Sequence, residues 1–170
     1  MSAERIYDTR NQLGFNLNDP KTGLYPEMLD QAKEDGCECP TCGQFVKIYK
    51  QSISGITAKC LIEMWKRHKS KWFHIDEVNR INPKNGGNFA KLRHWGLVLE
   101  KEHEKGAERK RTSGWWCVTH TGHRFIQNEI MIPKYKLLYN GKVLGDDGPA
   151  VGISATLTEK FDYNMLMEGL

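Results

Sequence analysis

The chain has 170 residues, which is long enough to bury a substantial core without help from disulfides. It is 39% hydrophobic and 27% charged, and its formal net charge is +4, a composition typical of globular proteins. The apolar runs are only a few residues long, and no apolar stretch follows the charges of residues 1–10. We therefore expect no membrane span, no leader and a cytoplasmic location.

The charge is unevenly distributed along the chain. Residues 66–111 contain thirteen Lys and Arg against six Asp and Glu, a surplus of seven, whereas residues 1–36 contain four against seven, a deficit of three. A concentrated basic surplus is expected where one face of a protein meets a polyanion. A solvated basic face without a partner is the alternative, and charge alone does not separate the two.

Residues 1–36 are predicted to be an acidic N-terminal region with one short helix. Pro26 and Gly36 bracket the helical segment, because proline suits a first helical turn and glycine suits the residue after the last. Residues 1–25 show no clear period, so they are either an extended arm or disordered.

Residues 37–52 contain the cysteine motif CECPTCG. Five cysteines are an odd number for pairing, and three of them, Cys37, Cys39 and Cys42, lie too close together for a relaxed disulfide framework. A Cys-Pro-x-Cys-Gly turn presents two thiolates in the knuckle geometry that tetrahedral zinc requires. We predict zinc on Cys37, Cys39 and Cys42, with a metal-free loop as an equally weighted alternative and a redox role below both.

A fourth zinc ligand is not evident from the sequence. Cys60 is the only other nearby cysteine, but its place on an apolar helical stripe favours burial in the core. The remaining candidates are a second chain or one of the histidines His68, His74, His120 and His123.

Residues 53–132 are predicted to form one domain that begins with three helices. Apolar residues recur at three- and four-residue steps from Ile53 to His68, with Ser54 or Ser52 as the cap. An extended piece at 71–74 precedes a two-turn helix over 75–81, which Pro83 ends. Phe89, Leu92 and Trp95 mark a third helix that Gly96 ends in a left-handed conformation.

Two strands and a fourth helix follow. Residues 97–101 and 114–119 have the composition of paired strands, and the polar segment 102–113 joins them as a basic loop. The order of three helices, strand, basic loop, strand and helix predicts an α+β fold with a winged helix-turn-helix core.

Two passages resemble winged-helix regulators of the MarR and PadR types. Residues 89–100 read FAKLRHWGLVLE, like the passage from recognition helix to first wing strand in those families, and residues 118–126 read VTHTGHRFI, like the helix start after the second strand. The resemblance covers roughly the middle half of the chain. It implies that the third helix enters the major groove of duplex DNA while the wing follows the backbone.

The whole chain, with its CPTCGQ motif and the tail from Pro133 to Gly145, also resembles small uncharacterised proteins of tailed bacteriophages. This resemblance implies a phage origin, hence the cytoplasm of the host cell, and no known activity. The long dimerisation helices typical of the regulator families are not evident in the sequence.

The predicted DNA-contacting residues belong to the third helix and to the wing. Amide side chains at the leading end of the helix reach adenine edges, and basic side chains of the wing pair with phosphates. The predicted contacts are Lys84, Asn85, Asn88, Lys91, Arg93, His94, Lys105, Arg109, Lys110 and Arg111. Ordinary solvated helix residues are the alternative for Lys91 and Arg93.

Core packing is the favoured interpretation of the five tryptophans, Trp65, Trp72, Trp95, Trp115 and Trp116. Strand alternation buries only one of Trp115 and Trp116 and leaves the other as a surface contact.

Residues 133–170 are predicted to be a tail. Asn140 and Gly141 indicate a hairpin, and scattered apolar residues after it indicate one or two short helices. A hairpin alone is marginal in water, so the tail docks either on the winged helix or on a second subunit.

No nucleophile elbow, phosphate loop or paired-histidine zinc motif occurs in the sequence, and we expect no enzymatic activity. The sequence predicts a duplex DNA-binding protein, specifically a phage-type transcriptional regulator. The alternative is a protein-binding module or a phage inhibitor of a host factor. The oligomeric state is not fixed by the sequence.

Overall fold

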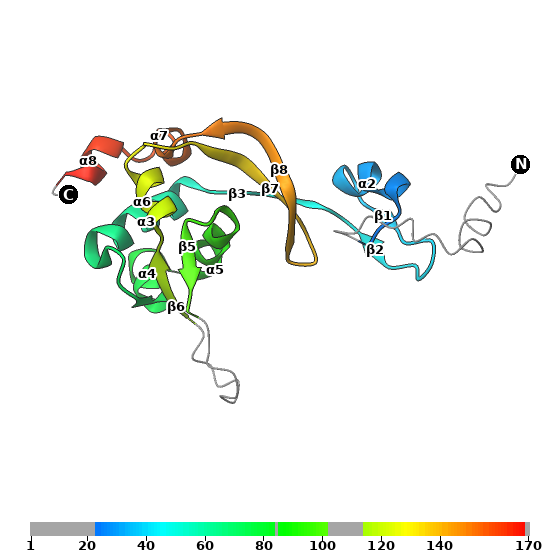
Figure 1. Cartoon of the computed structure of the whole chain (residues 1–170), viewed down its shortest axis with the longest axis horizontal. Coiled ribbons are helices and arrows are strands. Elements are labelled where there is room, and N and C mark those ends of the chain that lie inside the picture. The colour runs from blue at the N-terminus through cyan, green and yellow to red at the C-terminus, as the bar shows by residue number, and fades with distance from the viewer. Residues whose placement is uncertain (1–22, 84, 102–113, 169–170) are drawn as a thin grey trace, which may run out of the picture. The chain divides into compact units, whose positions relative to one another are not determined.

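The computed structural model describes residues 23–83, 85–101 and 114–168. Helices and three small antiparallel sheets give an α+β structure, as predicted (Figure 1). None of the described helices is of a length and apolarity that would cross a membrane.

The chain divides into two compact units. Residues up to 50 together with 137–145 form one, which we call the knuckle unit, and residues 51–136 together with 146–170 form the other, which we call the helical unit. The predicted boundary at 132/133 does not separate them. The reason is that the tail hairpin contributes its tip to the knuckle unit, whereas the helices after it belong to the helical unit.

The knuckle unit begins with helix α2 (Pro26–Lys33), in the predicted place and with Pro26 in its first turn. Strand β1 (Cys37–Glu38) pairs antiparallel with β2 (Phe45–Val46). The Ile48 amide donates to the Ala32 carbonyl at 2.7 Å and so ties the chain after β2 to the helix. The buried core is small and consists of Leu24, Met28, Ala32, Val46 and Ile48.

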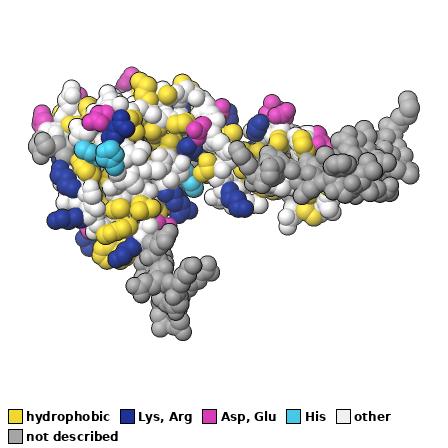
Figure 2. All heavy atoms as spheres, in the orientation of Figure 1, with side chains coloured by type: hydrophobic (Ala, Val, Ile, Leu, Met, Phe, Trp, Pro, Cys, Tyr) yellow, Lys and Arg dark blue, Asp and Glu magenta, His cyan; other side chains and the backbone are white. Residues whose placement is uncertain are grey.

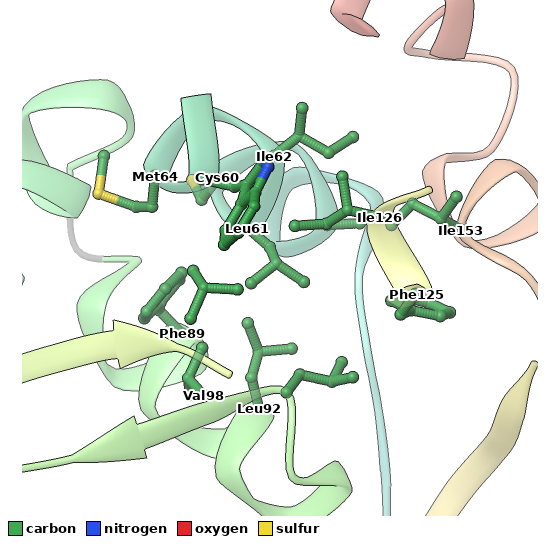
Figure 3. Close-up of a cluster of buried hydrophobic side chains, with 14 of the residues drawn as sticks. Cys60, Leu61, Ile62, Met64, Phe89, Leu92, Val98, Phe125, Ile126 and Ile153 are labelled. Atoms are coloured by element: carbon green, nitrogen blue, oxygen red, sulfur yellow. The ribbon is translucent and has the colours of Figure 1, made fainter. Parts of the chain in front are cut away.

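The helical unit is built around α3 (Gly55–His68). The helix begins directly after Ser54, one of the two predicted caps, which accepts a hydrogen bond from the Thr57 amide. One face of α3 is fully buried, including Cys60, which confirms the predicted core position of that thiol (Figure 3). Leu61 and Met64 lie on the same helix and face Phe89 and Leu92 across the core.

The predicted succession of elements after α3 is present. Strand β4 (Phe73–His74) leads into α4 (Ile75–Ile81), and α5 (Gly86–Ala90) follows after a short turn. The predicted third helix is not a continuous α-helix, because α5 passes into a 3₁₀ helix, η1 (Lys91–Trp95). Side chains three residues apart eclipse in a 3₁₀ helix, which turns both Leu92 and Trp95 toward the core. We call 86–95 the third helical segment.

Gly96 ends the third helical segment with a φ of 69°, the left-handed conformation predicted for it. Strands β5 (Val98–Glu100) and β6 (Trp115–Val118) then pair antiparallel, and β4 pairs with the other edge of β6. The strand order is therefore β4-β6-β5. Helix α6 (His120–Ile126) follows, capped by Thr119.

The tail forms a longer hairpin than predicted. Strands β7 (Ile132–Tyr139) and β8 (Lys142–Val151) belong to a sheet of order β3-β7-β8, in which β3 is Tyr49–Ser52. Asn140 and Gly141 both have positive φ, as the predicted two-residue turn requires.

Helices α7 (Ile153–Leu157) and α8 (Tyr163–Met167) confirm the two short helices expected in the tail. Ile153 and Leu157 are fully buried in the core around α3, so the helical unit itself buries this part of the tail.

Candidate nucleic-acid interface

The third helical segment is anchored in the core of the helical unit. Phe89 and Leu92 are at most 1% exposed, and Phe89 packs edge-on against Phe73 with ring centroids 5.8 Å apart. The Trp95 indole donates its N–H to the Pro133 carbonyl at 2.7 Å. Lys91 and Arg93, which lie between these anchors, and Asn88, which directly precedes Phe89, are not part of the buried core.

Asn85 is placed differently from the prediction. Its side chain is only 3% exposed, and its amide nitrogen lies 3.3 Å from the Cys60 sulfur as a donor. The Thr57 hydroxyl donates to the Asn85 carbonyl oxygen at 3.5 Å. Asn85 therefore satisfies polar groups inside the helical unit and does not contact DNA, which corrects the prediction.

Asn88 and Lys91 stay available on the surface. The Lys91 ammonium donates to the Asn88 side-chain oxygen at 3.2 Å, so one residue orients the other. Both line a pocket of about 180 Å³ beside the start of α3. Its other lining residues are Gln51, Ser52, Ile53, Ser54, Thr57, Leu92 and Trp95. The hollow thus presents hydroxyl, amide and ammonium groups next to the third helical segment.

Cations gather around His94 from two elements. Partial burial and the positive charges of Arg93, Lys91 and Lys136 lower the pKa of His94 below its usual value. Arg93 pairs with Glu100 at 3.2 Å, and Lys136 pairs with Asp146, so both cations are partly neutralised. The site therefore combines the expected helix residues with Lys136 of β7, which the sequence analysis assigned to the tail.

The remaining predicted contacts, Lys84, Lys105, Arg109, Lys110 and Arg111, lie outside the described residues. Figure 2 shows Lys and Arg side chains next to hydrophobic ones close to where the chain leaves β5 and β6 for residues 102–113. Lys101 directly follows β5, and its backbone amide donates to the Trp115 carbonyl at 2.8 Å and so extends the pairing of β5 with β6.

Two of the five tryptophans do not belong to the core. Trp65, Trp95 and Trp116 are buried, as predicted, and Trp115 is 42% exposed, as alternation requires. Trp72 is 39% exposed, which corrects the prediction that it packs in the core. It directly precedes β4, and the pairing of β4 with β6, which no local sequence pattern revealed, determines the face on which it lies.

The knuckle places two cysteines together and the third apart. The backbone N–H groups of Cys42 and Thr41, and the Cys42 thiol, hydrogen-bond to the Cys39 sulfur and lower the pKa of that thiol. The Cys37 thiol instead points to the Met28 carbonyl at 3.9 Å. In the part of the chain that the structure describes, no three Cys, His, Asp or Glu side chains converge as a metal site.

Three of the four histidines considered as a fourth ligand have other partners. His68 lies 2.7 Å from Glu77, His74 accepts a hydrogen bond from the Asp76 amide, and His123 stacks on Trp65 with ring centroids 4.2 Å apart. Cys39 and Cys42 therefore lie together as a pair of thiols, and the described residues place no third metal-ligating side chain with them.

Comparison of the chain with protein-family models, with curated proteins and with solved structures finds no match.

Proposed function

We propose that this protein binds duplex DNA through the third helical segment and the basic connection between β5 and β6, as a winged helix does. Helix α4, the turn after it and the third helical segment would then be the helix-turn-helix, and the β4-β6-β5 sheet would carry the wing. Regulation of transcription by a phage-type protein is the proposed biological role.

The observation that carries the proposal is the division of the third helical segment into two sides. Phe89, Leu92 and Trp95 anchor one side in the core, whereas Asn88, just before Phe89, is exposed and Lys91, just before Leu92, is half-buried and donates to Asn88. The cluster of cations that lowers the pKa of His94 adds a positive potential on the same surface. A rigid support beneath a polar, cationic surface is what base-edge reading and phosphate pairing require.

Fluorescence anisotropy of mixed-sequence duplex at two salt concentrations tests the proposal. We expect tight binding at low salt that weakens steeply as salt is added, because each phosphate contact releases a counterion. Lys91→Ala should lower the affinity and reduce the slope of log affinity against log salt by about 1. A variant with Lys105, Arg109, Lys110 and Arg111 all changed to alanine should lose more affinity than Lys91→Ala and show a larger reduction of the salt slope.

Lys160→Ala is the matched control, because it removes the same charge from an exposed position between α7 and α8. It should bind like the unchanged protein. Equal losses in Lys91→Ala and Lys160→Ala would indicate a general effect of net charge, and no binding at low salt would refute the proposal.

A further inference from the structure

The β4-β6-β5 sheet has an outer face that the core does not cover. His74 pairs with Trp115, and Leu99 pairs with Cys117, so these side chains project from the same side of the sheet. Lys101 continues β5 opposite Trp115, and Trp72 lies two residues before His74. We call Trp72, His74, Leu99, Lys101, Trp115 and Cys117 the outer sheet face.

The outer sheet face leaves large apolar side chains in water. Trp72 and Trp115 are 39% and 42% exposed, and Leu99 is 53% exposed, whereas Trp116 on the inner side is 3% exposed. A cluster of exposed large apolar residues on one sheet indicates a binding surface, because isolated exposed residues need no explanation but clustered ones do.

The charges of this face favour an anionic partner with flat rings. The Lys101 ammonium lies 5.9 Å from the Trp72 ring centroid, and Lys71 next to Trp72 is exposed. His74 contacts Trp115 edge-on at 5.6 Å and pairs with Asp76 at its border. None of the six residues of the face is acidic. Aromatic rings interleaved with cations are the pattern of proteins that stack nucleic-acid bases and track the phosphates.

We propose that the outer sheet face binds single-stranded DNA, with unpaired bases stacked on Trp115 and Trp72 and the phosphates paired with Lys101 and Lys71. The choice of DNA over RNA rests on the proposed duplex binding. A second copy of this chain fits the face less well, because two such faces would bring the lysines of both copies together.

The test uses the full chain and a fluorescent oligothymidylate, which has no duplex structure. Trp115→Leu keeps an apolar side chain but removes the ring, and we expect roughly five- to 150-fold weaker binding, the range of one lost base stack. Trp115→Phe should restore most of the affinity. Leu99→Ala, on the same face, should leave oligothymidylate affinity within about twofold of the unchanged protein.

A hairpin-capped duplex without unpaired bases is measured with the same variants. Unchanged capped-duplex binding in Trp115→Leu, together with weaker oligothymidylate binding, supports the proposal. If the protein binds oligothymidylate through Trp115 but does not bind the capped duplex, the single-strand proposal is still supported. Only the proposed duplex binding is then refuted.

Three outcomes overturn the proposal. Oligothymidylate affinity that neither Trp115→Leu nor Trp72→Leu changes shows that bases do not stack on this face. Equal losses of oligothymidylate affinity in Leu99→Ala and Trp115→Leu show that the aromatic ring has no specific role, which is contrary to base stacking. Much tighter binding of oligouridylate than of oligothymidylate shows that the partner is RNA.

Discussion

The two units of this chain differ in how much apolar surface each buries. Among the residues that the structure describes, the helical unit has a core of twenty buried residues around α3, whereas the knuckle unit has five. A core of twenty residues can stabilise a unit of this size, but a core of five rarely can without a metal, a disulfide or a partner. The comparison indicates that the stability of the helical unit is internal and that the knuckle unit depends on something in addition to its core.

Removal of metal from the knuckle should produce the largest effect. If zinc occupies the Cys39 and Cys42 thiolates, a chelator should unfold the knuckle unit, since structural zinc contributes on the order of 10 kcal/mol in small domains. Hydrogen exchange of the Ile48 amide, which is bonded to Ala32 at 2.7 Å, should accelerate. All five tryptophans lie in the helical unit, so tryptophan fluorescence should stay unchanged.

Cys42→Ser provides the matched variant and should match the chelated protein in both readouts. Mass spectrometry of the native protein supplies the independent measurement of metal content. A protein that contains no metal and keeps its Ile48 amide protected would show that the five-residue core is sufficient.

Two phenylalanines compare the units directly. Phe89 is fully buried in the helical unit, and Phe89→Ala should lower the free energy of unfolding by about 3–5 kcal/mol through lost burial and the resulting cavity. Phe45 on β2 is 63% exposed, and Phe45→Ala should change the free energy of unfolding by less than about 0.5 kcal/mol. Urea denaturation measures both effects, followed by tryptophan fluorescence for Phe89→Ala and by hydrogen exchange of the Ile48 amide for Phe45→Ala.

Two glycines of the helical unit contrast a closely packed backbone position with an open one. A side chain on Gly122 would approach the Leu97 carbonyl oxygen to 2.1 Å, so Gly122→Ala should destabilise the helical unit by about 1–3 kcal/mol or more. Gly87 on α5 faces open space, and Gly87→Ala should stabilise that unit by about 0.5–1 kcal/mol because alanine restricts the unfolded chain. Thermal melting of both variants should show shifts of opposite sign.

Local sequence signals determined the helices, and distant pairings determined the rest. The Ser54 cap and the apolar spacing predicted α3 to within two residues, and the Asn140–Gly141 turn predicted the tail hairpin. The burial of Asn85 was not predictable, because its partner Cys60 lies 25 residues away and a polar residue gives no apolar pattern. The two-unit division escaped prediction for the same reason, since the hairpin tip joins the knuckle unit only through long-range contacts.

The last prediction concerns pH and has the smallest expected effect. The fold lowers the pKa of His94, first by burial and then through the charges of Arg93, Lys91 and Lys136. The folded state therefore favours the neutral imidazole, while the unfolded chain takes up a proton near pH 6.5. The contribution of His94 to stability is present above that pH and is lost as the pH falls toward the folded pKa. Solvent screening keeps it small, because the ring is partly exposed.

His94→Gln isolates this contribution from that of the other histidines. As the pH falls from 7.5 to 5.5, the free energy of unfolding of the unchanged protein should decrease more than that of His94→Gln. Duplex affinity should change in the opposite direction, because a phosphate near His94 favours its protonated form and binding therefore strengthens at the lower pH. If the duplex affinity of the unchanged protein and of His94→Gln has the same pH dependence, the phosphates do not approach this part of the third helical segment.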